Sequence, residues 1–286
     1  MNTFNFCELT DRALLNITGK DATSFLQALI TCDVETLKTG DITFGALLSP
    51  QGKILFDFFI IKSVDGFMFD IDKSMADSFT HRIQFYKMRA DVVVSKANEN
   101  TLVFATWGDC LIEAQEAGLD ALLVNDPRLP EMGLRVYINF PPKQAKIHPL
   151  GNYTKHRLKF GMPSGGLDFI FGTAFAHEAL MDQFAGVDFS KGCFVGQEVV
   201  SRMQHRGSAR KRFVSVSSEV DLPENGTEIM AEGKVVGTLT SHFEKSGIAL
   251  VRLDRVANSV AQNLTIMAGT TKISLKLQDW VSYDWG

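Results

Sequence analysis

Long apolar runs, paired cysteines and a secretory leader are all missing from this chain of 286 residues. The richest apolar stretch, residues 54–61, is eight residues long and contains Asp57, whereas a membrane-spanning helix needs about 18 to 20. The first residues show neither a basic segment nor an apolar one after it, so we expect a cytoplasmic protein without a membrane partner. The chain has four widely spaced cysteines, Cys7, Cys32, Cys110 and Cys193, and no C-x-x-C pair. This spacing argues against a disulfide framework and against a zinc knuckle.

Several common enzyme signatures are also missing. The chain has no G-x-x-x-x-G-K-[ST] phosphate loop, no G-x-G-x-x-G fingerprint and no G-x-S-x-G elbow. His177-Glu178 is not followed by the second histidine of a zinc protease. ATP hydrolysis, hydride transfer and serine hydrolysis therefore lose support, and we expect no permanently bound metal.

The composition is that of a folded protein. With 45% hydrophobic and 22% charged residues, burial offsets the conformational entropy of the chain. The net charge of −4 argues against a nucleic-acid partner, which would require an extended basic surface.

Hydrophobic periodicity predicts a mixed α+β fold. Alternating patterns indicate strands, and the 3.6-residue period indicates helices, without a regular βαβ array. The expected strands are 12–18, 44–48, 53–62, 67–71, 90–94, 102–105, 122–124 and 134–138, and the expected helices are 21–29, 74–86 and 153–158. Asp21 is expected to cap the first helix, and residues 49–52 to form a turn.

The last part of the chain differs from the first in its pattern of glycine and β-forming residues. Residues 161–172 are glycine-rich and predict an irregular loop. Short β-rich runs separated by glycine turns follow, at 213–216, 235–240, 248–253 and 272–277, and they predict a small sandwich or barrel. We expect a first region at 1–210 and a second at 211–286.

Candidate functional residues are most frequent in the segment Lys191–Arg212, which has six basic residues and one acid, Glu198. A turn at 192–196 and a helix ended by Gly207 are expected, with Arg202 and Arg206 on one face. Cys193 would lie just before this helix and beside Lys191, where the helix dipole and the ammonium favour a thiolate. Two alternatives stay open at this stage, because a lone cysteine is most often buried and basic helix residues are usually solvated.

The segment KGCFVGQE at 191–198, with Arg202 and Arg206-Gly207 after it, closely resembles the signature of YgfZ-type folate-binding proteins. These are relatives of the glycine cleavage T-protein, an aminomethyltransferase. The resemblance extends over most of the chain, through residues 12–21, 25–27, 31–34, 50–53, 157–163 and 177–178.

The resemblance implies a ring of domains with ferredoxin-like α+β parts and a small C-terminal β-barrel. It also implies a bound tetrahydrofolate and a role in assembly or repair of iron–sulfur proteins, including those that thiolate tRNA. Cys193 is then the signature thiol, with the family-implied folate neighbours Lys191, Gln197, Glu198 and Arg202. Tyr153, as an aromatic surface, and Arg12 are further candidates, although a core role for Tyr153 is an equal alternative.

Departures from the T-protein pattern argue against glycine cleavage. Phe56 stands where the T-protein has one of two paired acids, and only Asp57 remains. Lys159 replaces a glutamate that contacts the pterin, and a lysine cannot accept hydrogen bonds. Asp57 is a candidate catalytic base, with a solvent-side strand residue as the alternative.

We therefore expect a monomeric folate-binding accessory protein that contacts iron–sulfur clients transiently through Cys193. The alternative is a folate-dependent one-carbon transferase that uses Asp57. A third hypothesis is that the basic helix docks tRNA or a client protein.

Overall fold

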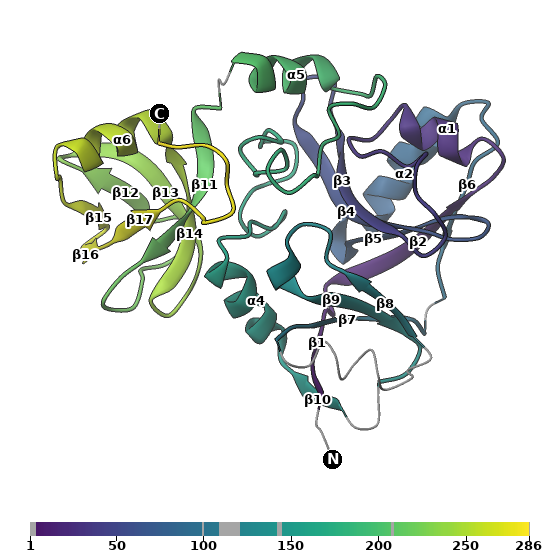
Figure 1. The fold of residues 1–286 in the computed structure, drawn as a ribbon, viewed down its shortest axis with the longest axis horizontal. Coiled ribbons are helices and arrows are strands. Elements are labelled where there is room, and N and C mark those ends of the chain that lie inside the picture. The colour runs from purple at the N-terminus through teal and green to yellow at the C-terminus, as the bar shows by residue number, and fades with distance from the viewer. Residues whose placement is uncertain (1–3, 99, 109–120, 142–144, 207–208, 286) are drawn as a thin grey trace. The chain divides into compact units, whose positions relative to one another are not determined.

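The computed structural model describes residues 4–98, 100–108, 121–141, 145–206 and 209–285 (Figure 1). The chain divides into two compact units. Unit 1 holds residues 1–153 and 184–197, and unit 2 holds residues 154–183 and 198–286. The expected boundary between residues 210 and 211 stays a prediction, because unit 2 contains earlier segments as well as the last 76 residues.

Unit 1 contains a five-stranded antiparallel sheet. Its order is β3 (Ile42–Leu48), β4 (Ile54–Lys62), β5 (Gly66–Asp72), β2 (Arg12–Thr18) and β6 (Val93–Lys96). The first four strands lie where the periodicity predicted them, and the turn at 49–52 forms with Gly52 donating to the carbonyl of Ser49. The strand expected at 90–94 is confirmed in part, because β6 begins at Val93 and residues 90–92 form a turn after the preceding helix.

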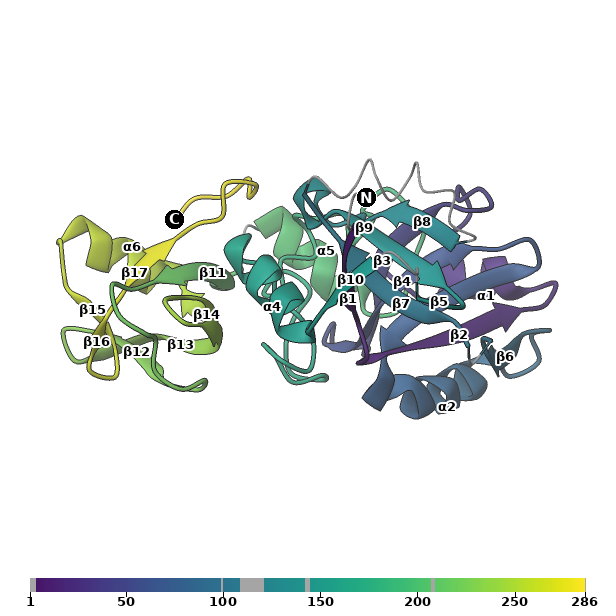
Figure 2. The same cartoon turned by 90° about the horizontal axis from the view of Figure 1, so that it is seen from below.

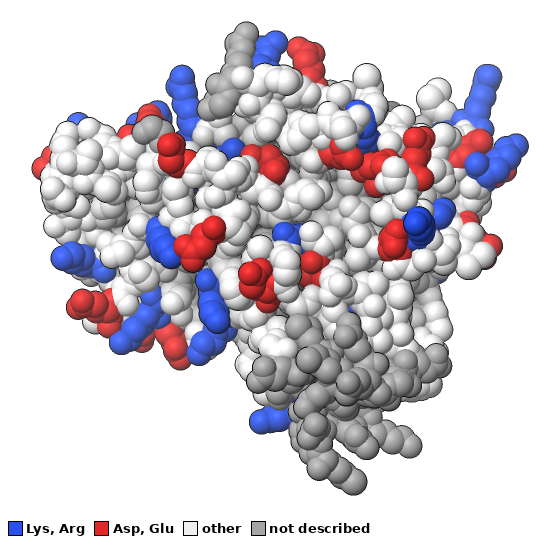
Figure 3. Space-filling view, viewed as in Figure 1, with Lys and Arg blue, Asp and Glu red and all other residues white. Residues whose placement is uncertain are grey.

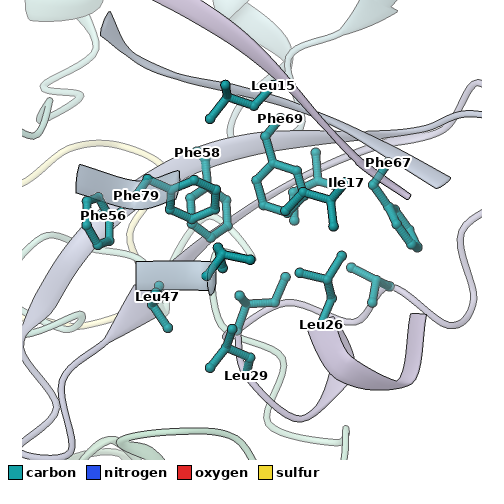
Figure 4. Close-up of a cluster of buried hydrophobic side chains, with 14 of the residues drawn as sticks. Leu15, Ile17, Leu26, Leu29, Leu47, Phe56, Phe58, Phe67, Phe69 and Phe79 are labelled. Atoms are coloured by element: carbon teal, nitrogen blue, oxygen red, sulfur yellow. The ribbon is translucent and has the colours of Figure 1, made fainter. Parts of the chain in front are cut away.

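One face of this sheet is covered by the helices α1 (Ala22–Gln27) and α2 (Ala76–Lys87). Phe79 of α2 is fully buried, and its ring centroid lies 5.3–5.4 Å from those of Phe56, Phe58 and Phe69 (Figure 4). Burying each ring contributes about 1.5–3 kcal/mol. These contacts fix α2 on the sheet (Figure 2).

The expected cap of α1 is wrong. Asp21 makes no side-chain bond to the start of the helix. Its Oδ2 instead accepts a hydrogen bond from the amide of Asp91, at 2.8 Å. Asp21 therefore ties the beginning of α1 to the turn before β6, a long-range contact that local sequence cannot show.

A second sheet completes unit 1. Its order is β10 (Ala145–His148), β1 (Phe4–Glu8), β7 (Leu102–Thr106), β9 (Leu134–Ile138) and β8 (Ala121–Asn125), with only β1 and β10 pairing in parallel. A shared core joins the two sheets, since Ile61 of the first packs with Cys7 and Tyr137 of the second. The two sheets of unit 1 therefore form one body.

Unit 2 contains a nearly closed seven-stranded β-barrel. Its order is β16 (Thr271–Lys272), β15 (Ile266–Ala268), β12 (Glu228–Ala231), β13 (Lys234–Phe243), β14 (Ser246–Arg252), β11 (Lys211–Ser217) and β17 (Ser274–Lys276). The strands expected at 213–216 and 235–240 lie within β11 and β13, and the one expected at 248–253 extends one residue past β14. The one expected at 272–277 is split between β16 and β17. The helix α6 (Leu253–Ala261) was not predicted.

The irregular loop predicted at 161–172 is confirmed, and buried polar contacts hold it. The helix α4 (Leu150–Lys159) precedes it. Arg157, at 3% exposure, donates to Asp168 Oδ2 at 2.7 Å and to the carbonyl of Met162 at 3.0 Å. Asp168 also accepts from the amide of Ser164. Ionic contacts thus replace regular backbone pairing in this loop.

Within the described residues, no helix has both the length and the apolar character required to cross a membrane.

Candidate functional site

The segment 186–191, which leads into the KGC sequence, is bonded to residues 30–32 in unit 1. The amide of Asp188 donates to the carbonyl of Thr31 at 2.9 Å, and the hydroxyl of Thr31 donates to the carbonyl of Gly186 at 2.6 Å. The Asp188 carboxylate accepts from the amides of Ser190 and Lys191. These bonds fix the path of the chain before Cys193.

The side chain of Lys191 adds two more bonds to the same place. Its ammonium donates to the carbonyls of Ile30 at 2.8 Å and Cys32 at 2.7 Å. Burial lowers the pKa of Lys191, and nearby Cys32 and the carboxylates oppose that shift. The ammonium is thus occupied by main-chain oxygens, which is a different task from the folate contact expected for it.

Cys193 is exposed at the end of this anchored segment, next to the buried Phe194. Helix α5 (Gln197–Arg206) begins four residues later, as expected, while its expected last residue, Gly207, lies outside the described residues. Cys7 and Cys32 are buried, and Cys110 lies outside the described residues. Among the cysteines that the structure describes, only Cys193 offers its thiol to solvent.

The buried Cys32 is chemically unlike Cys193. Burial raises the pKa of the Cys32 thiol to about 12, although the neighbouring Lys191 ammonium acts in the opposite direction. A thiol with that pKa is protonated at neutral pH and is a poor nucleophile. Cys32 is therefore not a candidate nucleophile, and the reactivity expected for Cys193 stays a prediction.

Gly196 holds the turn between Cys193 and α5 against the turn at 49–52. Its φ of +82° lies in the left-handed region, which favours glycine. A Cβ atom at this position would lie 2.6 Å from the carbonyl oxygen of Ser49. Only glycine lets the two backbones approach this closely, so the position of Cys193 depends on it.

Three other members of the signature lie on α5. Gln197 is half-buried, whereas Glu198 and Arg202 are exposed and pair at 3.4 Å. An exposed pair of this kind contributes at most about 1 kcal/mol, so Arg202 is free to exchange partners. The side chain of Arg206 is not among those described.

A pocket of about 490 Å³ lies beside the anchored segment in unit 1. Its polar lining includes Cys32, Asp33, Thr36, Asp188 and Ser190. Burial opposes the ionisation of Asp33 and Asp188, but hydrogen bonds from their own turns hold both pKa values below the usual range. The carboxylates of this pocket thus serve to hold the loop.

Asp57 lies on β4 opposite Ala46 of β3 and is half-buried. Neighbouring strand residues point to opposite faces. Phe56 accordingly packs in the core under α2, whereas Asp57 shares the other face with Phe59. Asp57 thus lies on the sheet face away from the helices. Both interpretations of this residue, a catalytic base and a solvent-side strand residue, stay predictions.

That same face carries a charged network which the sequence did not reveal. The guanidinium carbons of Arg135, Arg128 and Arg12 lie 3.8, 4.7 and 5.9 Å from the ring centroid of Phe59. Arg12 and Arg135 both donate to the carboxylate of Asp70, which is completely buried. The network thus links β2 and β5 of the first sheet to β9 of the second.

The network includes both Tyr153 and Arg12. Arg128 donates to Tyr153 Oη at 2.9 Å and pairs with Asp126. The ring of Tyr153 packs at 6.2 Å from that of Trp107. Tyr153 and Arg12 are therefore brought into one network, while Lys191 and Cys193 lie at the anchored segment.

The charges of the network stabilise one another. Burial alone would raise the pKa of Asp70, but Arg12 and Arg135 outweigh it and hold that pKa below its usual value. Burial and the charge of Asp70 both raise the pKa of Tyr137, which donates to Asp70 Oδ2. An ionisable residue inside an apolar strand, such as Asp70 in FMFDID, was the signal that could have located this network.

Metal chemistry receives no support from side-chain geometry in the described part of the chain. No three His, Cys, Asp or Glu side chains there are grouped closely enough to hold a metal ion. On the face shown in Figure 3, Lys and Arg alternate with Asp and Glu.

Two family models match the chain. The GCVT N-terminal domain covers residues 2–110, and the C-terminal beta-barrel domain of CAF17 covers residues 210–283. The crystal structure of the glycine cleavage aminomethyltransferase T from Bartonella henselae aligns with a TM-score of 0.77 over 99% of this chain and 88% of that one. At 16% identity, that likeness shows the fold alone.

Similar sequences include proteins named as mitochondrial homologues of the iron–sulfur cluster assembly factor IBA57. The one from Neurospora crassa is 32% identical over 72% of this chain and 52% of its own length. The one from Mycosarcoma maydis is 28% identical over 89% and 75%. The chain thus spans about half the length of the Neurospora relative.

These comparisons confirm the GcvT-like α+β fold with a C-terminal barrel, whereas the YgfZ group itself stays a prediction. The expected cytoplasmic location is wrong, because the relatives are mitochondrial proteins. The expectation rested on composition and on the residue pattern of the first segment, and neither of these identifies the compartment.

Proposed function

Because this chain joins a GCVT N-terminal domain to a CAF17-type barrel on the aminomethyltransferase fold, we propose that it assists iron–sulfur cluster assembly through the thiol of Cys193. The observation that carries the proposal is the exposure of Cys193 on a segment fixed by Lys191. The similar proteins are named as iron–sulfur cluster assembly factors, and this supports a role in the same process.

A single thiol cannot hold an iron–sulfur cluster by itself. When a thiol binds iron, it loses its proton and supplies one ligand, whereas a cluster needs several. The remaining ligands must come from a client protein, so contact with it is transient. A fixed, exposed thiol suits such a contact, because it meets the client without a large rearrangement.

The test is complementation of cells that lack this protein. A Cys193→Ser variant should fail to restore the activity of iron–sulfur enzymes, while Lys245→Ala, an exposed change in the barrel, should restore it. Both variants must accumulate to the level of the wild type. Full restoration by the Cys193→Ser variant would remove the thiol from the mechanism.

Tetrahydrofolate is the proposed cofactor, and the residues fit it in part. A flat pterin requires an aromatic surface and amide-like partners, and its acidic tail requires a cation. Taken one by one, the half-buried Tyr153, which also contacts Trp107, has an aromatic ring, Gln197 has an amide and Arg202 has a guanidinium. Arg12 and Lys191 already donate to Asp70 and to main-chain carbonyls, and Glu198 pairs with Arg202, so these three are weaker candidates. When bound, the folate would supply one-carbon chemistry.

Calorimetric titration with tetrahydrofolate tests this assignment. Binding by the wild type should weaken about tenfold in Arg202→Ala, because a charge-assisted hydrogen bond to a tail carboxylate contributes about 1.5–3 kcal/mol. Tyr153→Leu should weaken it as well, and Lys245→Ala should not. An Arg202→Ala variant that binds like the wild type would exclude Arg202 from the folate site.

One-carbon transfer is the second candidate function. The position of Asp57 favours this function, because its carboxylate lies on the same sheet face as Phe59, whereas the neighbouring Phe56 points into the core. A single carboxylate could serve as a general base. This function predicts turnover of a one-carbon folate that is lost in Asp57→Asn, and unchanged turnover in that variant would exclude Asp57 as the base.

A further inference from the structure

The C-terminal end of α2 in unit 1 exposes two large apolar side chains. Phe85 is 75% exposed and Met88 is 86% exposed, and they are three residues apart. Phe85 makes an edge contact with Tyr86, at 5.8 Å between ring centroids. Exposure of this extent at neighbouring positions is typical of an interaction surface, since a helix gains nothing in water from such side chains.

The backbone of Met88 adds a second observation. It has a φ of +44° and a ψ of −99°, a backbone conformation that residues with a side chain rarely adopt. A methionine at this position strains the backbone and buries little of its side chain. The local structure therefore does not explain why the residue is a methionine, whereas a role for the exposed thioether does.

The same end of the helix is basic in an otherwise acidic chain. Residues 82–96 contain four basic side chains and one acid, Asp91, which pairs with Lys20. Arg82 is exposed and lies one helical turn before Phe85, and Arg89, just after the helix end, is exposed as well. Lys87 differs, because its ammonium donates to the carbonyl of Val92. Among the described residues, neither Arg82 nor Arg89 has an ion-pair partner, and in the sequence they stand on either side of Phe85 and Met88.

Strand β6 extends this surface. It is the edge strand of the first sheet, pairs with β2, and lies beside α2 (Figure 2). Val93, its first residue, is 52% exposed, and Lys96, its last, is also exposed. Because β6 contacts α2, Val93 and Lys96 add an exposed apolar side chain and an exposed basic one to this region of unit 1.

We propose that Arg82, Phe85, Met88, Arg89 and Val93, here named the α2 patch, form a docking site for an acidic protein segment with large apolar anchor residues. Charge complementarity selects the partner, since the two arginines attract carboxylates and repel basic surfaces. Phe85 and Met88 supply the apolar contact, and the flexible methionine adapts to the shape of an anchor. The proposal is independent of folate and of Cys193.

A defined probe tests the α2 patch. A fluorescein-labelled amphipathic helical peptide of leucine and glutamate is titrated with the whole protein and followed by anisotropy. A matched peptide with lysine in place of glutamate is the charge control. We expect the acidic peptide to bind, the basic one to bind at least about tenfold more weakly, and raised salt to weaken the acidic complex.

Two variants and a matched control make the test specific. A double variant with Phe85→Ser and Met88→Ser, and a second with Arg82→Glu and Arg89→Glu, should each weaken acidic-peptide binding at least about tenfold. Val64→Ser removes another apolar side chain of unit 1, 82% exposed and outside the patch, and should leave binding unchanged. Circular dichroism confirms that each variant is folded.

Three results would overturn the proposal: equal binding of both peptides, no loss of binding in the patch variants, or loss in Val64→Ser alone. Sedimentation provides a further check on the occupant. A wild-type dimer that becomes a monomer in the Phe85→Ser, Met88→Ser variant would show that a second copy of this chain covers the patch instead.

Discussion

The ammonium of Lys191 donates to the main-chain carbonyl of Cys32 across 2.7 Å and joins residues 159 positions apart in the sequence. A second bond, to the carbonyl of Ile30, fixes the ammonium in place. Lys191 is therefore a positioning residue for the segment that carries Cys193, and the buried Cys32 contributes its carbonyl rather than its thiol.

Replacing Lys191 by methionine should destabilise the protein by about 1–2 kcal/mol. Two charge-assisted hydrogen bonds are lost, and partial exposure of the side chain reduces the cost. Urea unfolding measures the change. Lys211→Met, which removes an exposed ammonium at the start of β11, is the control and should change stability by less than about 0.5 kcal/mol. Equal effects of the two substitutions would contradict the anchoring role.

Two glycines of the signature should differ sharply when replaced by alanine. Gly196→Ala places a Cβ atom against the Ser49 carbonyl at positive φ, and we expect a loss of about 1–3 kcal/mol. Gly192→Ala meets no atom within 4 Å and should be nearly neutral. Thermal unfolding of both variants checks this. A Gly196→Ala variant as stable as Gly192→Ala would show that the two turns do not pack closely.

Thiol labelling should separate the described cysteines. In a Cys110→Ser background near pH 8, we expect N-ethylmaleimide to modify Cys193 at least about 100-fold faster than Cys32. Cys32 is buried with a pKa of about 12, which leaves roughly one thiolate in 10,000 at that pH. Peptide mapping by mass spectrometry gives the two rates. Similar rates in the folded protein would mean that Cys32 opens to solvent.

Asp70→Asn should cost about 3–5 kcal/mol, because Arg12 and Arg135 would lose their shared buried counter-charge. Asp279→Asn breaks an exposed pair with Lys276 and should cost less than about 1 kcal/mol. Urea unfolding at neutral pH compares the two variants. Similar small losses would mean that the network is not a source of stability.

The same carboxylate should shape acid unfolding. Since the folded pKa of Asp70 lies below its unfolded value of about 4, its contribution is complete above about pH 4 and is lost as the pH falls through the folded value. Stability of Asp70→Asn should therefore fall less steeply with acid than that of the wild type. Parallel acid curves would contradict this.

His177 predicts a pH effect at a higher range. Burial lowers its pKa, against the charge of Asp182 and the hydrogen bond to Gln204. The unfolded chain then binds the proton more tightly, so the contribution of His177 is complete above about pH 6.5 and falls below it. His177→Gln should flatten the decline of the melting temperature between about pH 6.5 and about pH 5.5. An unchanged decline would assign it to other groups.

Local sequence was a sufficient guide to most of the regular structure. The strand β2 and the first half of β4 show alternating burial, and β3 and β5 are short, mostly buried apolar runs, patterns that depend on neighbours along the chain. The errors lie where a distant residue changes the outcome. Asp21 bonds to Asp91 rather than to its own helix, and the turn at 90–92 displaces β6.

The sequence by itself determined the α+β pattern, the short-stranded C-terminal region and the KGC segment before a helix, because propensity and periodicity act over a few residues. Only the tertiary structure decided that Cys193 is exposed, that Lys191 is bound to main-chain carbonyls and that three arginines surround Phe59. Exposure and charge pairing depend on which distant segments meet, and burial in the folded chain selects those partners.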